Sequence, residues 1–202
     1  MRIHSSSFEN NGPIAAEFAL GAPGGFGGNR NPQVEWDEVP EGTRSFVLMC
    51  IDTDAPTDPA LVAGDAPIPV DHPRGEFVHW VMVDIPADVR SIAAGSCSDG
   101  VTARGKASPP GPPGARQGRN DYTGWFEGDP DMGGDYRGYD GPYPPPNDLR
   151  LHRYFFRVFA LDLARLELPE AFTAGDVLRA IQGHVLAEGA VHGTYSLHPG
   201  VA

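Results

Sequence analysis

Three apolar runs in this chain each carry a polar residue at one end or inside, where a strand would otherwise be buried: 46–51 followed by Asp52, 77–83 containing His79, and 152–161 beginning at His152. Polar groups in such places are costly unless they have partners. Three of them in a chain of 202 residues therefore indicate one shared polar pocket on a β scaffold.

The alternation of residues along a strand predicts which side chains share a face of the sheet. The three runs give three sets, each on one face: Phe46, Leu48, Cys50 and Asp52; Phe77, His79, Val81 and Val83; and His152, Tyr154, Phe156 and Val158. The first run is apolar on both faces, which is typical of a central strand.

The composition fits a single loop-rich β domain over residues 1–202. Gly (26) and Pro (21) recur between the apolar runs, and 40% of the residues are hydrophobic, which is enough for a core. The formal net charge of −12 argues against nucleic acid and anionic membrane surfaces as partners, because both attract Lys and Arg.

The chain has two cysteines, Cys50 and Cys97, which are too few for a disulfide framework and fit a reducing compartment. Residues 1–5 lack the apolar stretch of a signal peptide. No run approaches the roughly 18 to 20 apolar residues of a transmembrane helix. We therefore expect a cytoplasmic protein that is not embedded in a membrane.

Outside the three runs the sequence predicts an early strand over 14–20, a glycine-rich loop over 21–28 and a final strand over 191–197. A helix is predicted to begin at Thr173, with Asp176 completing a capping box, and to end at Gly189. Residues 98–150 are rich in Gly, Pro, Asp and aromatic residues, which favours an ordered lid or rim.

Taken singly, the candidate site residues have ordinary structural interpretations. Asp52 and Asp54 could be turn-forming residues, a general acid and base, or metal ligands. His79 is typical of a core histidine that is hydrogen-bonded to a neighbour. Together with His152 and Tyr154, which point the same way, they form a better pocket than any of them does alone.

The chemistry of this set suits an oxyanion, because two imidazoles and a phenol can donate hydrogen bonds. The proline-rich loop before the third run can add the backbone N–H groups of Gly141 and Tyr143. A carboxylate would repel the anion, so we interpret Asp52 as a partner that orients a histidine and favours its charged form. No H-x-H, H-E-x-x-H, C-x-x-C or G-x-S-x-G pattern is present, so we expect no catalytic residue, no bound metal and no cofactor.

The order of these motifs resembles the phosphatidylethanolamine-binding protein family, and most closely its bacterial, Raf-kinase-inhibitor-like branch. The motifs are D-T-D-A-P at 52–56, H-W at 79–80, G-Y-D-G-P-Y-P-P at 138–145 and H-R-Y at 152–154. The similarity extends over about residues 26–197. Thr53 stands where the family often has proline, and the segment 124–137 is longer than in many relatives.

The resemblance implies a mainly β fold, a β-sandwich of a large central sheet and a smaller sheet with one or two peripheral helices. It also implies a small cavity for phosphate-type groups, with the ligand-binding residues Asp52, Asp54, His79, Gly141, Pro142, His152 and Tyr154. Members of the family regulate kinases or inhibit proteases, so a protein kinase or protease is an expected partner, and a homodimer is left open.

The sequence therefore favours a non-enzymatic binding protein for a phospholipid headgroup, a phosphorylated small molecule or a phosphopeptide. One alternative is a hydrolase that uses the Asp/His pocket directly or with a metal. Another is an interaction protein whose useful surface is the loop rich in Trp and Tyr.

Overall fold

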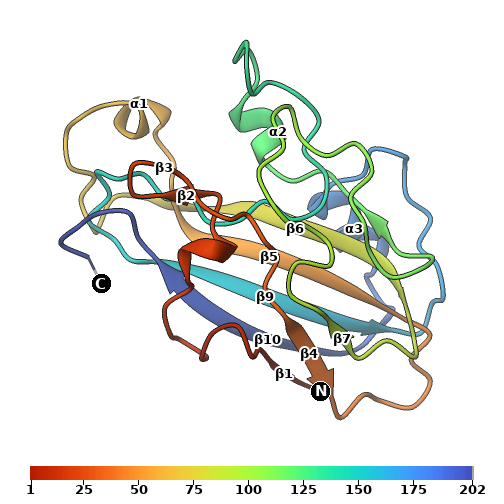
Figure 1. Cartoon of the computed structure of the whole chain (residues 1–202). Helices are drawn as coiled ribbons and strands as arrows, with labels where there is room; N and C mark the ends of the chain where they lie inside the picture. The colour runs from red at the N-terminus through yellow and green to blue at the C-terminus, as the bar shows by residue number, and fades with distance from the viewer. Residues whose placement is uncertain (202) are drawn as a thin grey trace.

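A five-stranded antiparallel sheet runs through the centre of the molecule, in the order β10-β9-β5-β6-β8 (Figure 1). The structure is a computed structural model, and it describes residues 1–201. The strands of this sheet are β5 (Ser45–Pro56), β6 (Arg74–Pro86), β8 (Arg116–Gln117), β9 (His152–Leu161) and β10 (Val185–Tyr195). The three apolar runs of the sequence are thus its three central strands.

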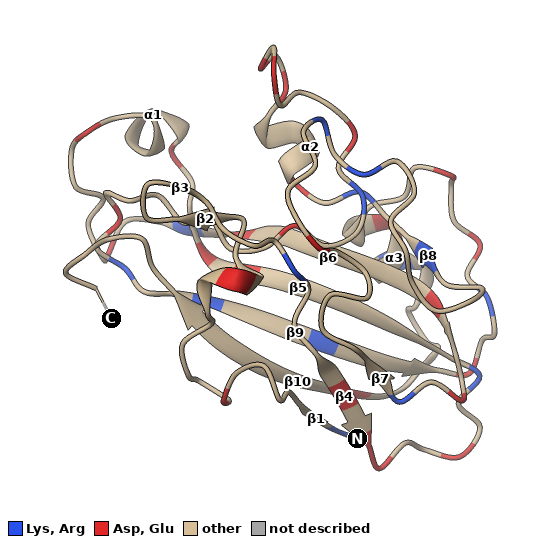
Figure 2. Cartoon of the chain, viewed as in Figure 1, with Lys and Arg blue, Asp and Glu red and all other residues tan. Residues whose placement is uncertain are grey.

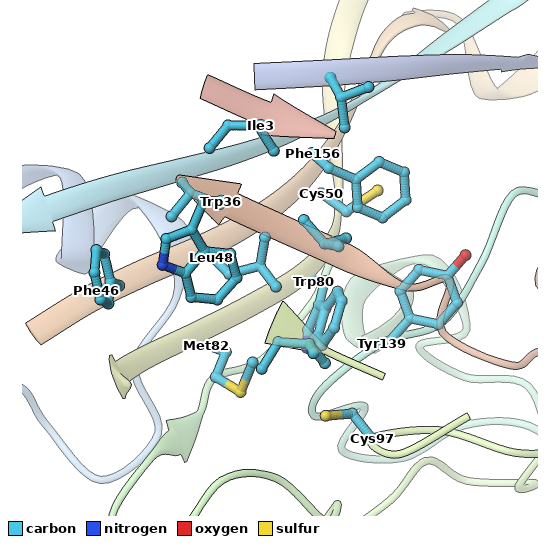
Figure 3. Close-up of a cluster of buried hydrophobic side chains, with 14 of the residues drawn as sticks. Ile3, Trp36, Phe46, Leu48, Cys50, Trp80, Met82, Cys97, Tyr139 and Phe156 are labelled. Carbon is cyan, nitrogen blue, oxygen red and sulfur yellow. The ribbon is translucent and has the colours of Figure 1, made fainter. Parts of the chain in front are cut away.

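A smaller antiparallel sheet covers one face of the large one (Figure 1). Its strands are β1 (Arg2–His4), β4 (Val34–Asp37) and β7 (Ser91–Ile92). The core between the two sheets is built around Trp36, Trp80 and Phe156, all fully or almost fully buried (Figure 3). Phe46, Leu48 and Cys50 face this core, as the alternation along β5 predicts.

The helix α3 (Ala174–Ala180) packs on the opposite face of the large sheet. Val177 and Ile181 lie there against Met49, Ile51 and Val81. The fold is therefore mainly β, a sandwich of a large and a smaller sheet with peripheral helices, and this prediction is confirmed.

Short elements surround the end of the large sheet where β5 finishes. The helices α1 (Pro59–Val62) and α2 (Tyr122–Trp125) rise on either side of this end (Figure 1). The remaining elements are the 3₁₀ helix η1 (Ala16–Phe18) and a hairpin of β2 (Gly21–Ala22) and β3 (Gly25–Phe26).

A β-bulge changes the expected orientation of β6. Cys50 pairs with Trp80, but the next residue of β5 pairs with Val78, so His79 is an extra residue in the ladder. Val81 and Val83 consequently face the α3 side, whereas His79 faces the other side together with Trp80. The prediction that His79 shares a face with Val81 and Val83 is therefore wrong.

The predicted strand over 14–20 is also wrong, because this segment forms η1 and then folds back against residues 27–30. Backbone N–H groups of Gly27 to Arg30 donate to carbonyls of the segment. A Cβ at Gly27 would lie 2.4 Å from the carbonyl oxygen of Ala19, so only glycine allows this close approach. The loop predicted over 21–28 contains the short β2–β3 hairpin.

At the C-terminal end, the predicted capping box is present, since the Thr173 backbone N–H donates to Asp176. The predicted helix end at Gly189 is wrong. The helix ends at Ala180, and Gly183 turns the chain with a φ of +80°. The final strand begins at Val185 rather than 191, and Gly189 lies inside it.

Acidic residues are spread along the loops and are interspersed with Arg rather than separated from it (Figure 2). Within residues 1–201, no helix has the length and apolar character needed to cross a membrane.

Candidate functional site

A cavity of about 300 Å³ opens at the end of the large sheet, between α1 and α2. Its polar floor consists of Asp52 from β5, His79 from β6 and His152 from β9. These strands are neighbours, and Asp52 pairs with Phe77 on one side and with Tyr154 on the other. The register of three adjacent strands therefore brings together the three polar residues that the sequence singled out.

His152 is held between two carboxylates. Its Nδ1 lies 2.7 Å from Oδ2 of Asp52, and its Nε2 lies 3.0 Å from Oδ2 of Asp148. Carboxylates only accept hydrogen bonds here, so both ring nitrogens are donors and the ring is an imidazolium. Burial alone would lower the pKa of His152, but the hydrogen bonds that it donates to Asp148 and Asp52 outweigh burial and raise the pKa to about 9.

Only one of the two ring nitrogens of His79 has a hydrogen-bond partner within residues 1–201. Its Nδ1 lies 2.8 Å from the backbone carbonyl oxygen of Asp140, which can only accept. Nδ1 therefore carries the proton, and Nε2 has no hydrogen-bond partner within residues 1–201. Burial lowers the pKa of His79, and the negative charge of Asp52 opposes this only in part. His79 is thus neutral near pH 7, and its unprotonated Nε2 is a hydrogen-bond acceptor at the cavity.

Asp140 fixes the position of His79. Its backbone N–H donates to the His79 carbonyl, so the two residues share a pair of hydrogen bonds across the bulge. The buried Asp140 carboxylate accepts from Asn29, Asn120 and the ammonium of Lys106, which lies 2.6 Å away. These contacts join segments that are far apart in the sequence, and they compensate for the ladder bond lost at the bulge.

Asp148 continues the charged network behind the floor. Its carboxylate accepts two hydrogen bonds from the guanidinium of Arg74, at 2.5 and 3.1 Å, as well as the one from His152. Both Asp148 and Arg74 are nearly inaccessible to solvent. Burial opposes the charged carboxylate, yet the hydrogen bonds from His152 and Arg74 hold the pKa of Asp148 well below its ordinary value.

Asp54, predicted as a ligand-binding residue, is fully buried and lies outside the set that lines the cavity. Its carboxylate accepts from Arg150 at 2.6 Å and from Arg153 at 2.8 and 2.9 Å. Burial raises the pKa of Asp54, but the two guanidinium groups outweigh this and lower it to about 2. In this structure Asp54 supports the end of β5 and does not face the cavity.

Gly141 and Pro142 likewise lie beside the cavity and not in its lining. The Gly141 N–H donates to Oδ1 of Asn29, and the Pro142 carbonyl accepts from Gly21. A Cβ at Gly141 would lie 2.1 Å from the Phe18 carbonyl oxygen, so glycine is required for this packing. The proposed contribution of the Gly141 N–H to an anion site is therefore unavailable in this arrangement.

Tyr154 lies directly behind the floor. Its ring contacts His79, with the centroids 5.2 Å apart, and His152, at 6.4 Å. The hydroxyl is buried and has no hydrogen-bond partner in the described part of the chain. Burial, and then the charge of Asp52, raise the pKa of Tyr154 well above its ordinary value, so it remains a protonated donor.

The walls of the cavity are aromatic and proline-rich. They are formed by Pro56, Val62, Phe77, Tyr122, Trp125, Phe126, Tyr143 and the prolines at 144–146. Trp125 and Tyr143 remain 49% and 40% exposed, so they form an apolar rim. The Tyr143 ring packs on Gly21, where a Cβ would lie 2.2 Å from the ring.

The sequence interpretation missed Asp148 and the wall residues as parts of the site. The aromatic residues of 98–150 had suggested a rim, but nothing in the sequence placed them above Asp52. Asp148 had one weak signal, namely a carboxylate four residues before His152. Among residues 1–201, no three His, Cys, Asp or Glu side chains are arranged so that they could hold a metal ion.

The comparison with known proteins agrees with this fold and these motifs. The model of the family described as phosphatidylethanolamine-binding protein matches residues 4–196. The chain belongs to the phosphatidylethanolamine-binding protein family.

Relatives in this family cover nearly the whole chain. The UPF0098 protein YbhB of Escherichia coli is 30% identical, over 97% of this chain and all of the relative, and a UPF0098 protein of Aquifex aeolicus is 32% identical, over 96% and 88%. The crystal structure of Escherichia coli YbcL, described as a new member of the mammalian family, superposes with a TM-score of 0.72 at 26% identity, covering 96% of this chain and 97% of that one.

Membership of the phosphatidylethanolamine-binding protein family, on the side of YbhB and YbcL, confirms the resemblance drawn from the motifs. In this member of the family, D-T-D-A-P ends β5, H-W spans the bulge of β6 and H-R-Y begins β9. The motif 138–145 runs from the Asp140 anchor to the proline wall. Three motifs thus supply the floor, and the fourth positions His79 and builds one wall.

Proposed function

We propose that this protein binds the phosphate-type group of a small molecule, headgroup or phosphopeptide in the cavity between α1 and α2, without transforming it. The observation that carries the proposal is the imidazolium of His152, fixed at the floor of the cavity. The family description supports it, since it names a phospholipid whose headgroup contains a phosphate.

The positive charge that faces the cavity is the imidazolium of His152 beside Asp52. The network joined to it is close to neutral, since Arg74, Arg150, His152 and Arg153 face Asp52, Asp54 and Asp148, and Asp121, which acts on His79, adds a fourth carboxylate. The apolar walls lower the polarity around the floor, which strengthens the attraction between His152 and an anion. They also offer a surface for the apolar or aromatic part of the ligand.

The same geometry argues against hydrolysis by these side chains. His152 cannot serve as a general base, because both of its nitrogens already donate to carboxylates. Of the residues that line the cavity in the described chain, none is Ser, Thr, Cys or Lys, so no activated nucleophile of those types stands beside His79. We therefore expect no turnover of phenyl phosphate or phenyl acetate that scales with protein concentration.

His79→Ala is expected to weaken the binding of inorganic phosphate by about tenfold or more. The change removes Nε2, the acceptor for a P–OH of the phosphate, and a hydrogen bond involving a charged group contributes roughly 1.5–3 kcal/mol. Isothermal titration calorimetry of the wild type and the variant measures this directly. His152→Ala should act in the same direction, but it also removes the cation shared by two buried carboxylates and so affects stability.

The matched control is His184→Ala. His184 also pairs with a carboxylate, since its Nδ1 lies 2.9 Å from Oδ1 of Asp162, but this pair is nearly half exposed and lies outside the cavity lining. The control should bind phosphate like the wild type. Equal affinity for phosphate in the wild type and a folded His79→Ala protein would refute the assignment.

A further inference from the structure

The polar atoms at the cavity floor are mainly hydrogen-bond acceptors. Oδ1 of Asp52 accepts the Asp54 backbone N–H at 2.7 Å, and Oδ2 accepts from His152 at 2.7 Å. Each oxygen retains a further lone pair, and neither carries a proton. His79 adds the bare Nε2, because its Nδ1 proton is committed to Asp140.

The donors that an anion would need are largely used within the protein. Both N–H groups of His152 go to carboxylates, and the Gly141 N–H goes to Asn29. The unpartnered hydroxyl of Tyr154 is fully buried behind the floor, outside the cavity lining, so it does not reach the cavity as a donor. An oxyanion without a proton would therefore be repelled at the floor, because its lone pairs would face the lone pairs of Asp52 and of Nε2 of His79.

An oxyanion that still carries a proton avoids this conflict. Its P–OH group can donate to Asp52, while its charged oxygens are attracted by the imidazolium of His152 at the floor. We propose that Asp52 selects ligands by this proton, so that the cavity takes phosphomonoesters in their singly protonated form and discriminates against phosphodiesters, sulfate esters and fully ionised phosphates. This inference rests on the proposed function and narrows its ligand class.

A cation such as a primary amine could also donate to Asp52, and the aromatic walls would tolerate it. The imidazolium of His152 disfavours it, because it already places a positive charge against Asp52 at the floor. The titratable groups that surround Asp52 from its own and neighbouring elements are Cys50, His79, Tyr122, His152, Arg153 and Tyr154. Burial lowers the pKa of His79, so it is neutral near pH 7 and takes up a proton only in more acid solution.

The test compares ligands that share a ring and a charge but differ by one proton. At about pH 5, below the second pKa near 6 of a phosphate monoester, phenyl phosphate is a monoanion with a P–OH group. Phenyl sulfate and methyl phenyl phosphate are monoanions without one. Calorimetry of the wild type should show phenyl phosphate binding about 10- to 100-fold more tightly than either.

Two further measurements test whether the P–OH proton of phenyl phosphate causes its tighter binding. The ratio of the phenyl phosphate and phenyl sulfate affinities should fall as the pH rises to about 8, because the monoester then loses its proton. Protonation of His79 at low pH turns Nε2 into a donor, which favours phenyl sulfate there and works against the expected fall of the ratio. Asp52→Asn places an amide donor at the floor and should reverse the preference toward phenyl sulfate. If this variant does not fold, the pH dependence of the affinity ratio in the wild type tests the proposal by itself.

The outcomes distinguish the two proposals. If phenyl sulfate binds as tightly as phenyl phosphate, selection by Asp52 is overturned, but anion binding in the cavity stands. If neither anion binds, the proposed function itself fails. Phenethylamine, which has the same ring and the opposite charge, should bind more weakly than phenyl phosphate, and tighter binding of the amine would overturn both.

Discussion

Asp148→Ala is expected to lower the free energy of unfolding by about 3–5 kcal/mol, the usual cost of removing one partner from a buried ion pair. The change leaves the buried guanidinium of Arg74 without its carboxylate and removes one of the two acceptors of His152. Chemical denaturation at pH 7, followed by circular dichroism, measures the loss.

The control for this prediction is Asp162→Ala, which breaks the exposed pair with His184. Exposed pairs contribute about 0–1 kcal/mol, so this variant should resemble the wild type. Similar small losses in both variants would show that the network behind the floor does not stabilise the fold.

Stability should also depend on pH through His152. Its pKa is about 9 in the folded protein, whereas an unfolded histidine titrates near 6.5. Because the folded pKa is the higher one, the stabilisation is fully present below pH about 6.5 and is lost as the pH rises through about 9. The wild type should therefore lose about 3 kcal/mol of its free energy of unfolding across this window.

Denaturation curves of the wild type and His152→Gln at about pH 6 and about pH 9.5 isolate this effect, because other groups titrate in both proteins. His184→Gln serves as the matched control and should retain the wild-type dependence. A wild type whose loss across the window equals that of His152→Gln would mean that His152 is not held as an imidazolium.

The faces of β5 and β9 could be predicted from the sequence because both strands alternate regularly through the core. Leu48 and Cys50 face the same core as Phe156 and Val158. The face of His79 could not be predicted in this way. The bulge in β6 depends on the contact with Asp140, 61 residues away along the chain, and no local pattern contains that information.

The C-terminal helix shows a second limit of periodicity. Val185 and Leu186 continue the apolar spacing of α3, yet they are exposed residues of β10. The turn at Gly183 ends the helix, and pairing of β10 with β9 then determines the conformation. Tertiary pairing thus outweighed a local helical pattern.

The residues of the candidate site likewise fall into those that local sequence patterns reveal and those that long-range contacts position. Asp52, His79 and His152 come from strands and were found from their unusual positions in apolar runs. Asp148 lies in a loop and Trp125 at the end of the short helix α2, and long-range contacts position both, namely the bonds of Arg74 to Asp148 and the packing of Trp125 against Phe77. Sequence reasoning therefore located the floor of the cavity and the motif that forms its proline-rich wall, but not Asp148 or the wall at α2.

The most direct test of the central claim is a crystal structure of the protein soaked in arsenate, which has the shape, charge and protons of phosphate and a strong anomalous signal. We expect one anomalous peak in the cavity, with an arsenate oxygen within hydrogen-bond distance of Asp52 and another near Nε2 of His79. An empty cavity at saturating arsenate, or a peak confined to surface arginines, would contradict the account.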